Sequence, residues 1–415
     1  VGRSNARGRP GTRLLVMYGG KGKGRGKHRE GGSRKDQEKI KTAERARLMW
    51  EGQVDMQQYS KMIADKVRTE SYNRAIQKLV RNKVVVEIGT GPFSVLSIFC
   101  ARAGARHVYA IEVNGWMIKK AQKAIDEAGY SDKITLIRGY STLLDLPQAV
   151  DVVVQEVIGN IATEEGMILA IRDAQTRFRD PRSGSPLLFI PERVRTLVAA
   201  VSLTSNVSDW KGDVINEHRG LFRVPWICHS SLASESKPIE AFDFSQKVDL
   251  SMESICCLEI LRDCNISGFL IYMETDLCKD IGFCSLRTSI STNPAESTNI
   301  SRFPKILQPQ TIPNTTTQHR DFVKYKDHSL PSTSSWQSVM VIFGHSVRGR
   351  AGDRVQFGFR GEYHTYPSRY RFNASIIRPQ SSRSPEQRLA DSFGEPLHLE
   401  GRESFGEALS LEGRY

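Results

Sequence analysis

Short β-branched runs alternate with helical stretches between residues 84 and 175. Each run has the length of a buried strand, and each intervening stretch carries apolar residues at helical spacing. Strands that alternate with helices are typical of a mostly parallel sheet with helices on both faces, so this region is predicted to be an α/β domain. The expected strands are 84–86, 108–111, 134–137 and 152–154, and the expected helices are 93–103, 115–128 and 163–175.

The pattern changes after Pro191, where many short β-like runs are interrupted by turn residues. Residues 193–377 are therefore predicted to form a largely antiparallel β domain, either a barrel or a sandwich. Within it, residues 274–327 look inserted, because most of that segment is rich in Ser, Thr, Asn and Pro. Before the α/β strands, helical spacing over residues 36–80 predicts N-terminal helices.

A glycine-rich turn with the sequence Glu-Ile-Gly-Thr-Gly follows the first expected strand, at residues 87–91. Glycines at a strand-to-helix turn let a ligand approach the backbone, and the helix that opens there presents free N–H groups. Glu112 ends the next strand, where a carboxylate can accept both ribose hydroxyls of a nucleoside. Ser94 occupies the third glycine position of the dinucleotide pattern, so the sequence lacks a pyrophosphate fingerprint.

Two glutamates nine residues apart form the second motif. Glu156 ends the fourth expected strand, and Glu165 precedes an apolar helical run, with a loop between them that is expected to fold back. The carboxyl ends of parallel strands are where such folds bind ligands, and paired carboxylates match the planar donors of a guanidinium. Taken alone, Glu164 and Glu165 are better explained as an acidic helix start that the helix dipole favours.

With these motifs, residues 59–193 resemble the protein arginine methyltransferase family. The resemblance implies that S-adenosylmethionine is the cofactor. A preceding helix resembles the one that closes over the cofactor in this family, with Arg68 placed to hold the methionine carboxylate. The expected cofactor-binding residues are Met62, Arg68, Glu87, Gly89, Thr90, Gly91 and Glu112.

The substrate side of the family pattern is also present. Glu156 and Glu165 have the spacing of its double-glutamate loop, which grips the substrate guanidinium, and they are the expected catalytic residues. Residues 190–193 resemble its junction to a C-terminal β-barrel, and Trp336 lies in the place of its Thr-His-Trp loop. Several positions depart from the family pattern. Phe93 and Ser94 replace its third glycine, Tyr59 and Ser335 each replace a histidine, and Thr142 stands where an acid often lies near the adenine.

The resemblance implies a Rossmann-like class I methyltransferase domain over residues 46–192 and a β-barrel-like substrate and dimerisation domain over residues 193–377. The implied activity is methyl transfer to a guanidinium nitrogen of protein arginine, including Arg-Gly-rich proteins. The two glutamates would orient the guanidinium and localise its charge away from the attacking nitrogen, and no metal is required. Residues 205–245 are the candidate arm for a homodimer.

Two other functions stay open on the sequence alone. The first is a methyltransferase that acts on another substrate, which would keep the glycine turn and Glu112 but give Glu165 no role. The second is a non-catalytic scaffold relative that binds RNA or protein through its basic N-terminal arm. Calorimetry with S-adenosylmethionine tests the second function, and peptide methylation followed by mass detection tests the first.

Composition limits which cellular compartments and which kinds of structural site are expected. No run of 18 or more apolar residues is present, so a membrane-spanning helix is not expected. Seven cysteines without a Cys-x-x-Cys pair fit reduced thiols and disfavour a disulfide framework or a zinc site. The cytoplasm or the nucleus is expected, and organelle targeting stays open because the sequence begins with Val1.

Both ends of the chain differ from the predicted domains. Residues 1–50 contain 15 Lys and Arg but only 4 Asp and Glu, so they hold most of the net charge of +13. Residues 1–45 are predicted to be a disordered, Gly- and Arg-rich arm, which is a flexible tail, a nucleic-acid-binding arm or a self-methylation substrate. The tail at 378–415 contains two copies of a twelve-residue repeat, at 391–402 and 403–414. Two copies are too few for a solenoid, so this segment is either a plain tail or a docking peptide.

We expect removal of residues 1–35 to leave the melting temperature nearly unchanged, because the arm has too little apolar surface to pack on the folded domains. Thermal unfolding of the full-length and shortened chains measures this, and a drop of many degrees would show that the arm packs. If the arm binds nucleic acid, truncation should remove this binding. In the full-length chain the binding should weaken steeply as salt is added.

Overall fold

The computed structural model describes most of the two predicted domains. The candidate arm at 205–245 and the insertion lie partly outside the described residues, and nearly all of the N-terminal arm and the C-terminal tail lie outside them. Within the part of the chain that is described, no helix is both long and apolar enough to cross a membrane. The described residues are 37, 40, 41, 44, 56–180, 185–203, 213–216, 221–286, 288–289, 334, 336–377 and 395–396.

A five-stranded parallel sheet with the order β3-β2-β1-β4-β5 forms the first domain, which confirms the predicted α/β fold. All five residues of β1 are buried, as expected for the central strand of a covered sheet. The fifth strand was not predicted, because Leu-Phe-Ile at 188–190 contains only one β-branched residue. The strands are β1 (Val84–Ile88), β2 (His107–Glu112), β3 (Ile134–Arg138), β4 (Val152–Gln155) and β5 (Leu188–Ile190).

Two helices of this domain begin at side-chain caps. Asp65 interrupts the helical stretch predicted over 36–80, because its extended backbone and its side chain, which accepts from the N–H of Arg68, cap a new helix. Asn114 caps the start of α5, and Gly129 ends it in the left-handed conformation. The helices are α2 (Met56–Ala64), α3 (Lys66–Leu79), α4 (Val95–Arg102), α5 (Gly115–Ala128) and α6 (Met167–Arg177), with a short 3₁₀ helix, η1 (Ser141–Leu143).

The strand order determines where a ligand can bind. Consecutive strands β1, β2 and β3 run toward one edge of the sheet, and β4 and β5 lie on the other side of β1. The carboxyl ends of β1 and β4 therefore flank the point where the order reverses, which is the usual ligand position in open α/β sheets. The glycine turn follows β1, and the segment with Glu156 and Glu165 follows β4.

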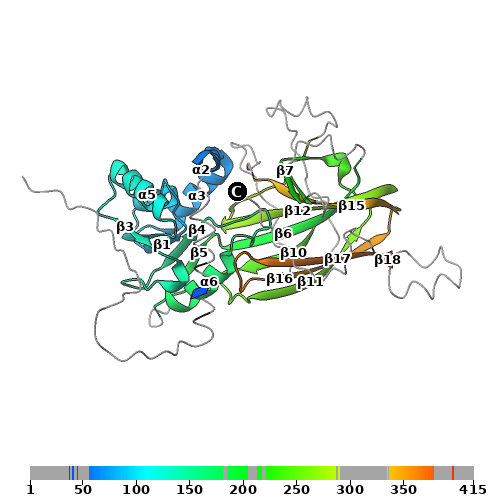
Figure 1. The fold of residues 1–415 in the computed structure, drawn as a ribbon. Coiled ribbons are helices and arrows are strands. Elements are labelled where there is room, and N and C mark those ends of the chain that lie inside the picture. The colour runs from blue at the N-terminus through cyan, green and yellow to red at the C-terminus, as the bar shows by residue number, and fades with distance from the viewer. Residues whose placement is uncertain are drawn as a thin grey trace, which may run out of the picture.

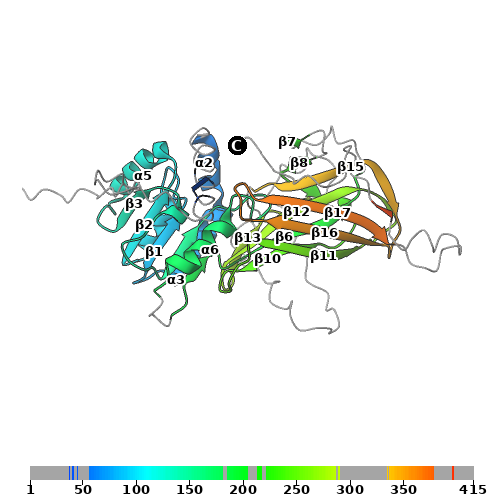
Figure 2. The same cartoon turned by 60° about the horizontal axis from the view of Figure 1, so that its bottom comes forward.

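The second domain consists largely of antiparallel strands, as predicted, and Figures 1 and 2 show it beside the α/β domain. Its described strands form a seven-stranded sheet, β10-β6-β12-β15-β8-β7 with β13 on β12, and a four-stranded sheet, β11-β16-β17-β18. β9 and β14 form a separate pair. The strands are β6 (Arg193–Val201), β7 (Asp213–Asn216), β8 (Leu221–Val224), β9 (Ile227–Cys228), β10 (Lys237–Asp243), β11 (Ser251–Glu259), β12 (Cys264–Cys278), β13 (Ile281–Cys284), β14 (Thr288–Ser289), β15 (Ser338–Gly349), β16 (Arg354–Glu362), β17 (Arg369–Ile377) and β18 (Glu395–Pro396).

An aromatic core joins the two antiparallel sheets. Phe269 of β12 lies edge-on to Phe343 of β15 and to Phe357 of β16, with ring centroids 5.2 and 4.8 Å away. Phe357 also contacts Phe372 of β17. Because these rings come from both sheets and are almost fully buried, the two sheets pack face to face around one core.

The first part of the segment predicted to be inserted consists of strand. β12 continues past residue 274 to Cys278 and pairs with β13, so ordered strands occupy the first part of the segment 274–327. The sequence did not indicate this extension, because the later part of β12 includes polar residues.

Candidate functional site

The glycine turn after β1 is tight and is hydrogen-bonded to the neighbouring strand β2. The N–H groups of Gly89 and Thr90 both donate to the carbonyl of Ile111 on β2. Gly89 and Gly91 have φ values of 78° and 64°, which favour glycine. Ser94, which replaces the third glycine, also adopts a positive φ of 46°, so the turn keeps a left-handed backbone at the start of α4 without a glycine.

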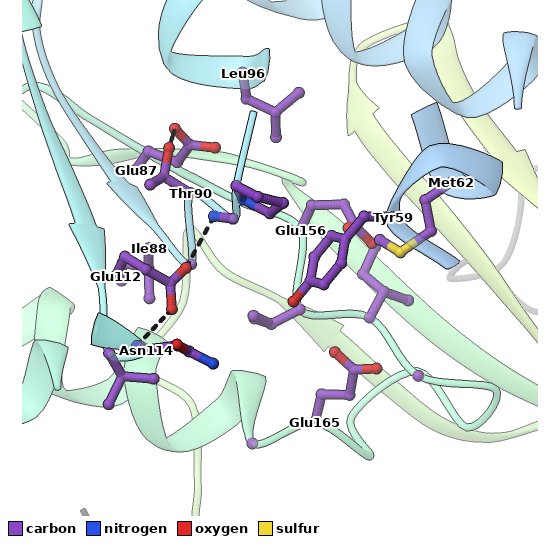
Figure 3. Close-up of a pocket in the computed structure, with 18 of the residues that line it drawn as sticks. Tyr59, Met62, Glu87, Ile88, Thr90, Leu96, Glu112, Asn114, Glu156 and Glu165 are labelled. Carbon is purple, nitrogen blue, oxygen red and sulfur yellow. Dashed lines mark hydrogen bonds between the residues drawn. The ribbon is translucent and has the colours of Figure 1, made fainter. Parts of the chain in front are cut away.

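Glu112 ties this turn to the end of β2. One carboxylate oxygen accepts from the N–H of Gly91 at 2.9 Å, and the other accepts from the N–H of Asn114 at 2.8 Å (Figure 3). Burial raises the pKa of Glu112, and these backbone hydrogen bonds act in the opposite direction. Each oxygen retains a second lone pair, so the carboxylate can still accept from a ligand.

Glu87 supports the turn from within the domain. Its carboxylate accepts from the hydroxyl of Thr90 at 2.6 Å and from the hydroxyl of Ser97 on α4. The side chain is nearly fully buried, and burial raises its pKa to about 7, although both hydroxyl hydrogen bonds lower it. Thr90 therefore uses its N–H and its hydroxyl inside the turn.

Arg68 on α3 forms a buried ion pair with Glu156 at the end of β4. The guanidinium Nη2 lies 2.5 Å from the carboxylate Oε2, and the two side chains are only 7% and 6% exposed. Arg68 also donates to the carbonyl of Met62 at 3.3 Å, and its guanidinium lies 5.7 Å from the centre of the Trp336 ring. Among the described residues, Nε of Arg68 and Oε1 of Glu156 are buried without a hydrogen-bond partner.

Two hydrogen bonds of Ser334 connect Trp336 of the second domain to Asp65, next to α3. The hydroxyl of Ser334 donates to the carboxylate of Asp65 at 2.8 Å and accepts from the N–H of Trp336 at 3.1 Å. Asp65 also caps α3, the helix that carries Arg68. Ser335 lies outside the described residues, so the observed hydrogen bond between the tryptophan segment (Ser334 and Trp336) and the cap of α3 comes from Ser334.

The segment between Glu156 and Glu165, which we call the glutamate loop, folds back on itself. The N–H of Gly159 donates to the carbonyl of Ala162, and the N–H of Asn160 donates to the Glu164 carboxylate at 3.0 Å. A side chain at Gly159 would collide with Glu164, because an added Cβ would lie 2.4 Å from the Glu164 Cβ. This fold places both Glu156 and Glu165 on the wall of one cavity.

The cavity has a volume of about 470 Å³ and gathers every residue predicted for the site. In Figure 3 the hydroxyl of Tyr59, on α2, points toward the space that Glu112 and Glu165 border. The Tyr59 ring also covers the glycine turn, since a Cβ on Gly91 would lie 3.4 Å from it. The predicted residues on the cavity wall are Met62, Arg68, Glu87, Gly89, Thr90, Gly91, Glu112, Glu156, Glu165 and Trp336.

Glu165 lies in an excess of negative charge. Burial and repulsion by Glu156 and Glu164 raise its pKa well above the usual range, and Arg223 and Arg68 offset only part of this effect. Arg223 comes from β8 of the second domain and lines the cavity. Sequence analysis missed Arg223, because no local pattern connects a residue of an antiparallel strand with a loop almost 60 positions earlier.

Tyr366 is another cavity residue that the sequence did not indicate. It follows β16 and lies against Gly166 at the end of the glutamate loop, where an added Cβ would come within 2.7 Å of its ring. Its neighbours in the sequence carry no recognisable motif, so only the fold reveals its position. Tyr366 and Arg223 show that the second domain completes the cavity wall.

The chain is similar in sequence to known protein arginine N-methyltransferases. It is 37% identical over 147 residues to Protein arginine N-methyltransferase 1 of Schizosaccharomyces pombe, covering 34% of this chain and 42% of the yeast protein. It is 36% identical over 254 residues to Probable protein arginine N-methyltransferase 1.2 of Arabidopsis thaliana, covering 57% and 66% of the two chains. The chain thus spans about two fifths of the yeast relative's length. No protein-family model matches it.

Two solved structures share the fold. The Trypanosoma brucei PRMT1 enzyme-prozyme heterotetrameric complex with AdoHcy aligns with a TM-score of 0.56 and 18% identity, over 78% of this chain and 94% of that chain. Arabidopsis thaliana Protein Arginine Methyltransferase 10, in an open conformation, aligns with a TM-score of 0.56 and 15% identity, over 79% and 95%. Both likenesses support a parallel sheet followed by antiparallel sheets.

We expect Glu87 to make stability depend on pH. Its pKa rises from 4.5 to about 7 on folding, so the unfolded chain releases the proton first, and the free energy of unfolding falls as pH increases from 4.5 to about 7. This contribution amounts to about 3 kcal/mol at most. Between pH 5 and pH 8, the free energy of unfolding measured with urea should decline less in Glu87→Gln than in the wild type. The control Glu253→Gln, which changes an exposed acid, should decline as the wild type does. Equal slopes in the wild type and Glu87→Gln would contradict the assignment.

Proposed function

Because this chain belongs to the protein arginine N-methyltransferase family, we propose that it transfers a methyl group from S-adenosylmethionine to a guanidinium nitrogen of a protein arginine. The observation that carries the proposal is the convergence of Glu156 and Glu165 on the cavity that also contains the glycine turn and Glu112. An arginine substrate needs both halves of this site, whereas a generic methyltransferase needs only the cofactor half.

The cofactor half fits S-adenosylmethionine. Glu112 would accept the ribose hydroxyls at the carboxyl end of β2, and the turn at 89–91 would let the nucleoside approach the backbone. The buried Nε of Arg68 has no hydrogen-bond partner among the described residues and suits the methionine carboxylate. When bound, the cofactor supplies a methyl group already activated on a sulfonium.

The substrate half fits a guanidinium. Glu156 offers a buried carboxylate oxygen without a partner among the described residues, and Glu165 lies where negative charge is only partly compensated. A guanidinium between them would donate to both carboxylates and lower the pKa of Glu165 toward the ionised form. The glutamates would then hold positive charge away from the attacking nitrogen, and one of them would accept its proton.

The tryptophan segment and α2 would enclose the reacting groups. Trp336 packs beside the Arg68 guanidinium, and Tyr59 lies over the glycine turn. Excluding water from this space strengthens the attraction between carboxylates and cation. In this proposal Tyr59 takes the position of a family histidine by contacting the cofactor through its ring and hydroxyl.

We expect Glu112→Ala to weaken S-adenosylmethionine binding by about 1–3 kcal/mol, because it removes a charged hydrogen-bond acceptor. Isothermal calorimetry on the full chain measures the change. Glu127→Ala is a suitable control, since Glu127 is an exposed acid on α5, away from the cavity wall. Unchanged affinity in Glu112→Ala would remove this residue from the cofactor site.

Glu156→Gln and Glu165→Gln keep the shape of each side chain but remove its charge. We expect each variant to lose peptide methylation by about a hundredfold or more, because preorganised charge at the reacting centre is lost. Labelled S-adenosylmethionine and Arg-Gly-rich peptides, with mass spectrometric identification of the modified residue, measure this. The Glu253→Gln variant is expected to retain activity, since its acid lies exposed on β11.

Both glutamate variants are expected to keep cofactor binding. Glu156→Gln and Glu165→Gln should each bind S-adenosylmethionine as the wild type does, because neither residue is assigned to the cofactor. Full arginine methylation by both variants would contradict the proposed substrate and leave a methyltransferase with a different acceptor. Failure of the wild type to bind S-adenosylmethionine would instead favour a scaffold function.

A further inference from the structure

A buried glutamate outside the cavity contacts the glutamate loop from the side of the second domain. Glu240 of β10 is only 1% exposed and does not line the cavity. Its carboxylate accepts from the hydroxyls of Thr196 and Tyr363, each at 2.6 Å, and from the hydroxyl of Thr163 at 3.0–3.1 Å. The proposed methyl transfer has no direct use for this charge.

Two of the three donors connect Glu240 to the loop. Thr163 is itself a loop residue, two positions before Glu165. Thr196 accepts from the N–H of Ala162 at 3.0 Å and donates its own proton to Glu240. Ala162 and Thr163 are therefore held, directly or through one hydroxyl, by the same carboxylate.

Two further side chains of the second domain complete the attachment. The hydroxyl of Ser368 donates to the carbonyl of Thr163 at 2.9 Å, and the hydroxyl of Tyr370 lies 2.8 Å from that of Thr163. All these side chains are buried to 1% exposure or less. The centre of the loop is thus anchored by side chains, whereas its two ends continue into β4 and α6.

The carboxylate oxygens of Glu240, which accept from three hydroxyls, give this network its direction. A hydroxyl donates only one proton, and an ionised carboxylate accepts from several donors at once. With Thr163, Thr196 and Tyr363 all donating to Glu240, the Tyr370 hydroxyl must donate to Thr163. A neutral side chain at position 240 would reverse or lose at least one of these hydrogen bonds.

Retaining a carboxylate in this place has an energetic cost. Burial raises the pKa of Glu240, and the hydrogen bonds from Thr196, Tyr363 and Thr163 lower it again. Apolar residues of similar volume often stabilise a core as well as such buried charges do. A role in fixing the conformation of the loop accounts for the charge better than a contribution to stability alone.

We propose that Glu240 is a positioning residue for the glutamate loop: through Thr163 and Thr196 it fixes the loop so that Glu156 and Glu165 face one cavity. The proposal rests on the proposed function for its effect on methyl transfer. Its effect on the loop itself does not depend on which substrate the cavity takes.

Hydrogen exchange provides the first test. In Glu240→Gln and in Thr163→Val, amides between residues 158 and 165 are expected to exchange about tenfold faster or more, because local opening becomes easier. Amides of β1 should keep their wild-type rates. Thr163→Val nearly preserves the volume of the side chain. It therefore tests whether the network anchors the loop even if Glu240→Gln fails to fold. Unchanged loop exchange in Thr163→Val would overturn the proposal.

Kinetics provide the second test. We expect kcat for arginine peptides to fall by about tenfold to a hundredfold in either variant, since small displacements of reacting groups have effects of this size. The S-adenosylmethionine Kd should stay at the wild-type value, and Glu240→Ala should lose more activity than Glu240→Gln, which keeps one acceptor oxygen. Glu253→Gln serves as the matched control on an exposed strand position.

A double variant of Glu240 and Thr163 tests whether the two residues act through the same hydrogen bonds. If Glu240 acts through Thr163, the double variant should lose little more than the more severe single variant. Fully additive losses would contradict the proposal. A wild type that binds S-adenosylmethionine but methylates no arginine peptide would refute the proposed function, while the exchange measurements would still decide the role of Glu240.

Discussion

A buried ion pair between Arg68 and Glu156 connects the elements on which the site depends. Arg68 comes from α3, Glu156 follows β4, and both side chains are almost fully withdrawn from water. Removing one partner of such a pair leaves an uncompensated buried charge, which typically costs about 3–5 kcal/mol. The position of the helix before the sheet and the position of the glutamate loop are therefore linked. In the proposed reaction, this pair would also connect the cofactor carboxylate with the substrate guanidinium.

The charge balance of the cavity follows from this pair. Arg68 pairs with Glu156, and Arg223 lowers the pKa of both Glu164 and Glu165. Burial and then repulsion by Glu156 and Glu164 still raise the pKa of Glu165, and the two arginines offset only part of that increase. A cationic substrate is a natural partner for such a cavity, because it would restore the balance at the point where the glutamates converge.

The second domain contributes to the site by holding it in place. Ser334 joins the tryptophan segment to Asp65, Tyr366 packs on Gly166, and the hydroxyl network around Glu240 anchors the centre of the glutamate loop. The loop therefore lies between a parallel sheet, from which it emerges, and an antiparallel domain, which fixes its shape. This arrangement explains why a site formed by the α/β domain still depends on the domain that follows it.

The sequence alone determined the α/β domain, the antiparallel domain after Pro191 and the two main motifs, because strand periodicity, glycine turns and short spacings are local properties of the chain. It identified residues 87–91 with Glu112, and Glu156 with Glu165, from their places at the ends of expected strands. Only the tertiary structure decided how far β12 extends, that Glu87 supports the turn from within, and that Arg223, Tyr366 and Glu240 surround the glutamate loop. The contacts of Arg223, Tyr366 and Glu240 join residues about 40 to 200 positions apart, and such tertiary pairings leave no periodic signal in the sequence.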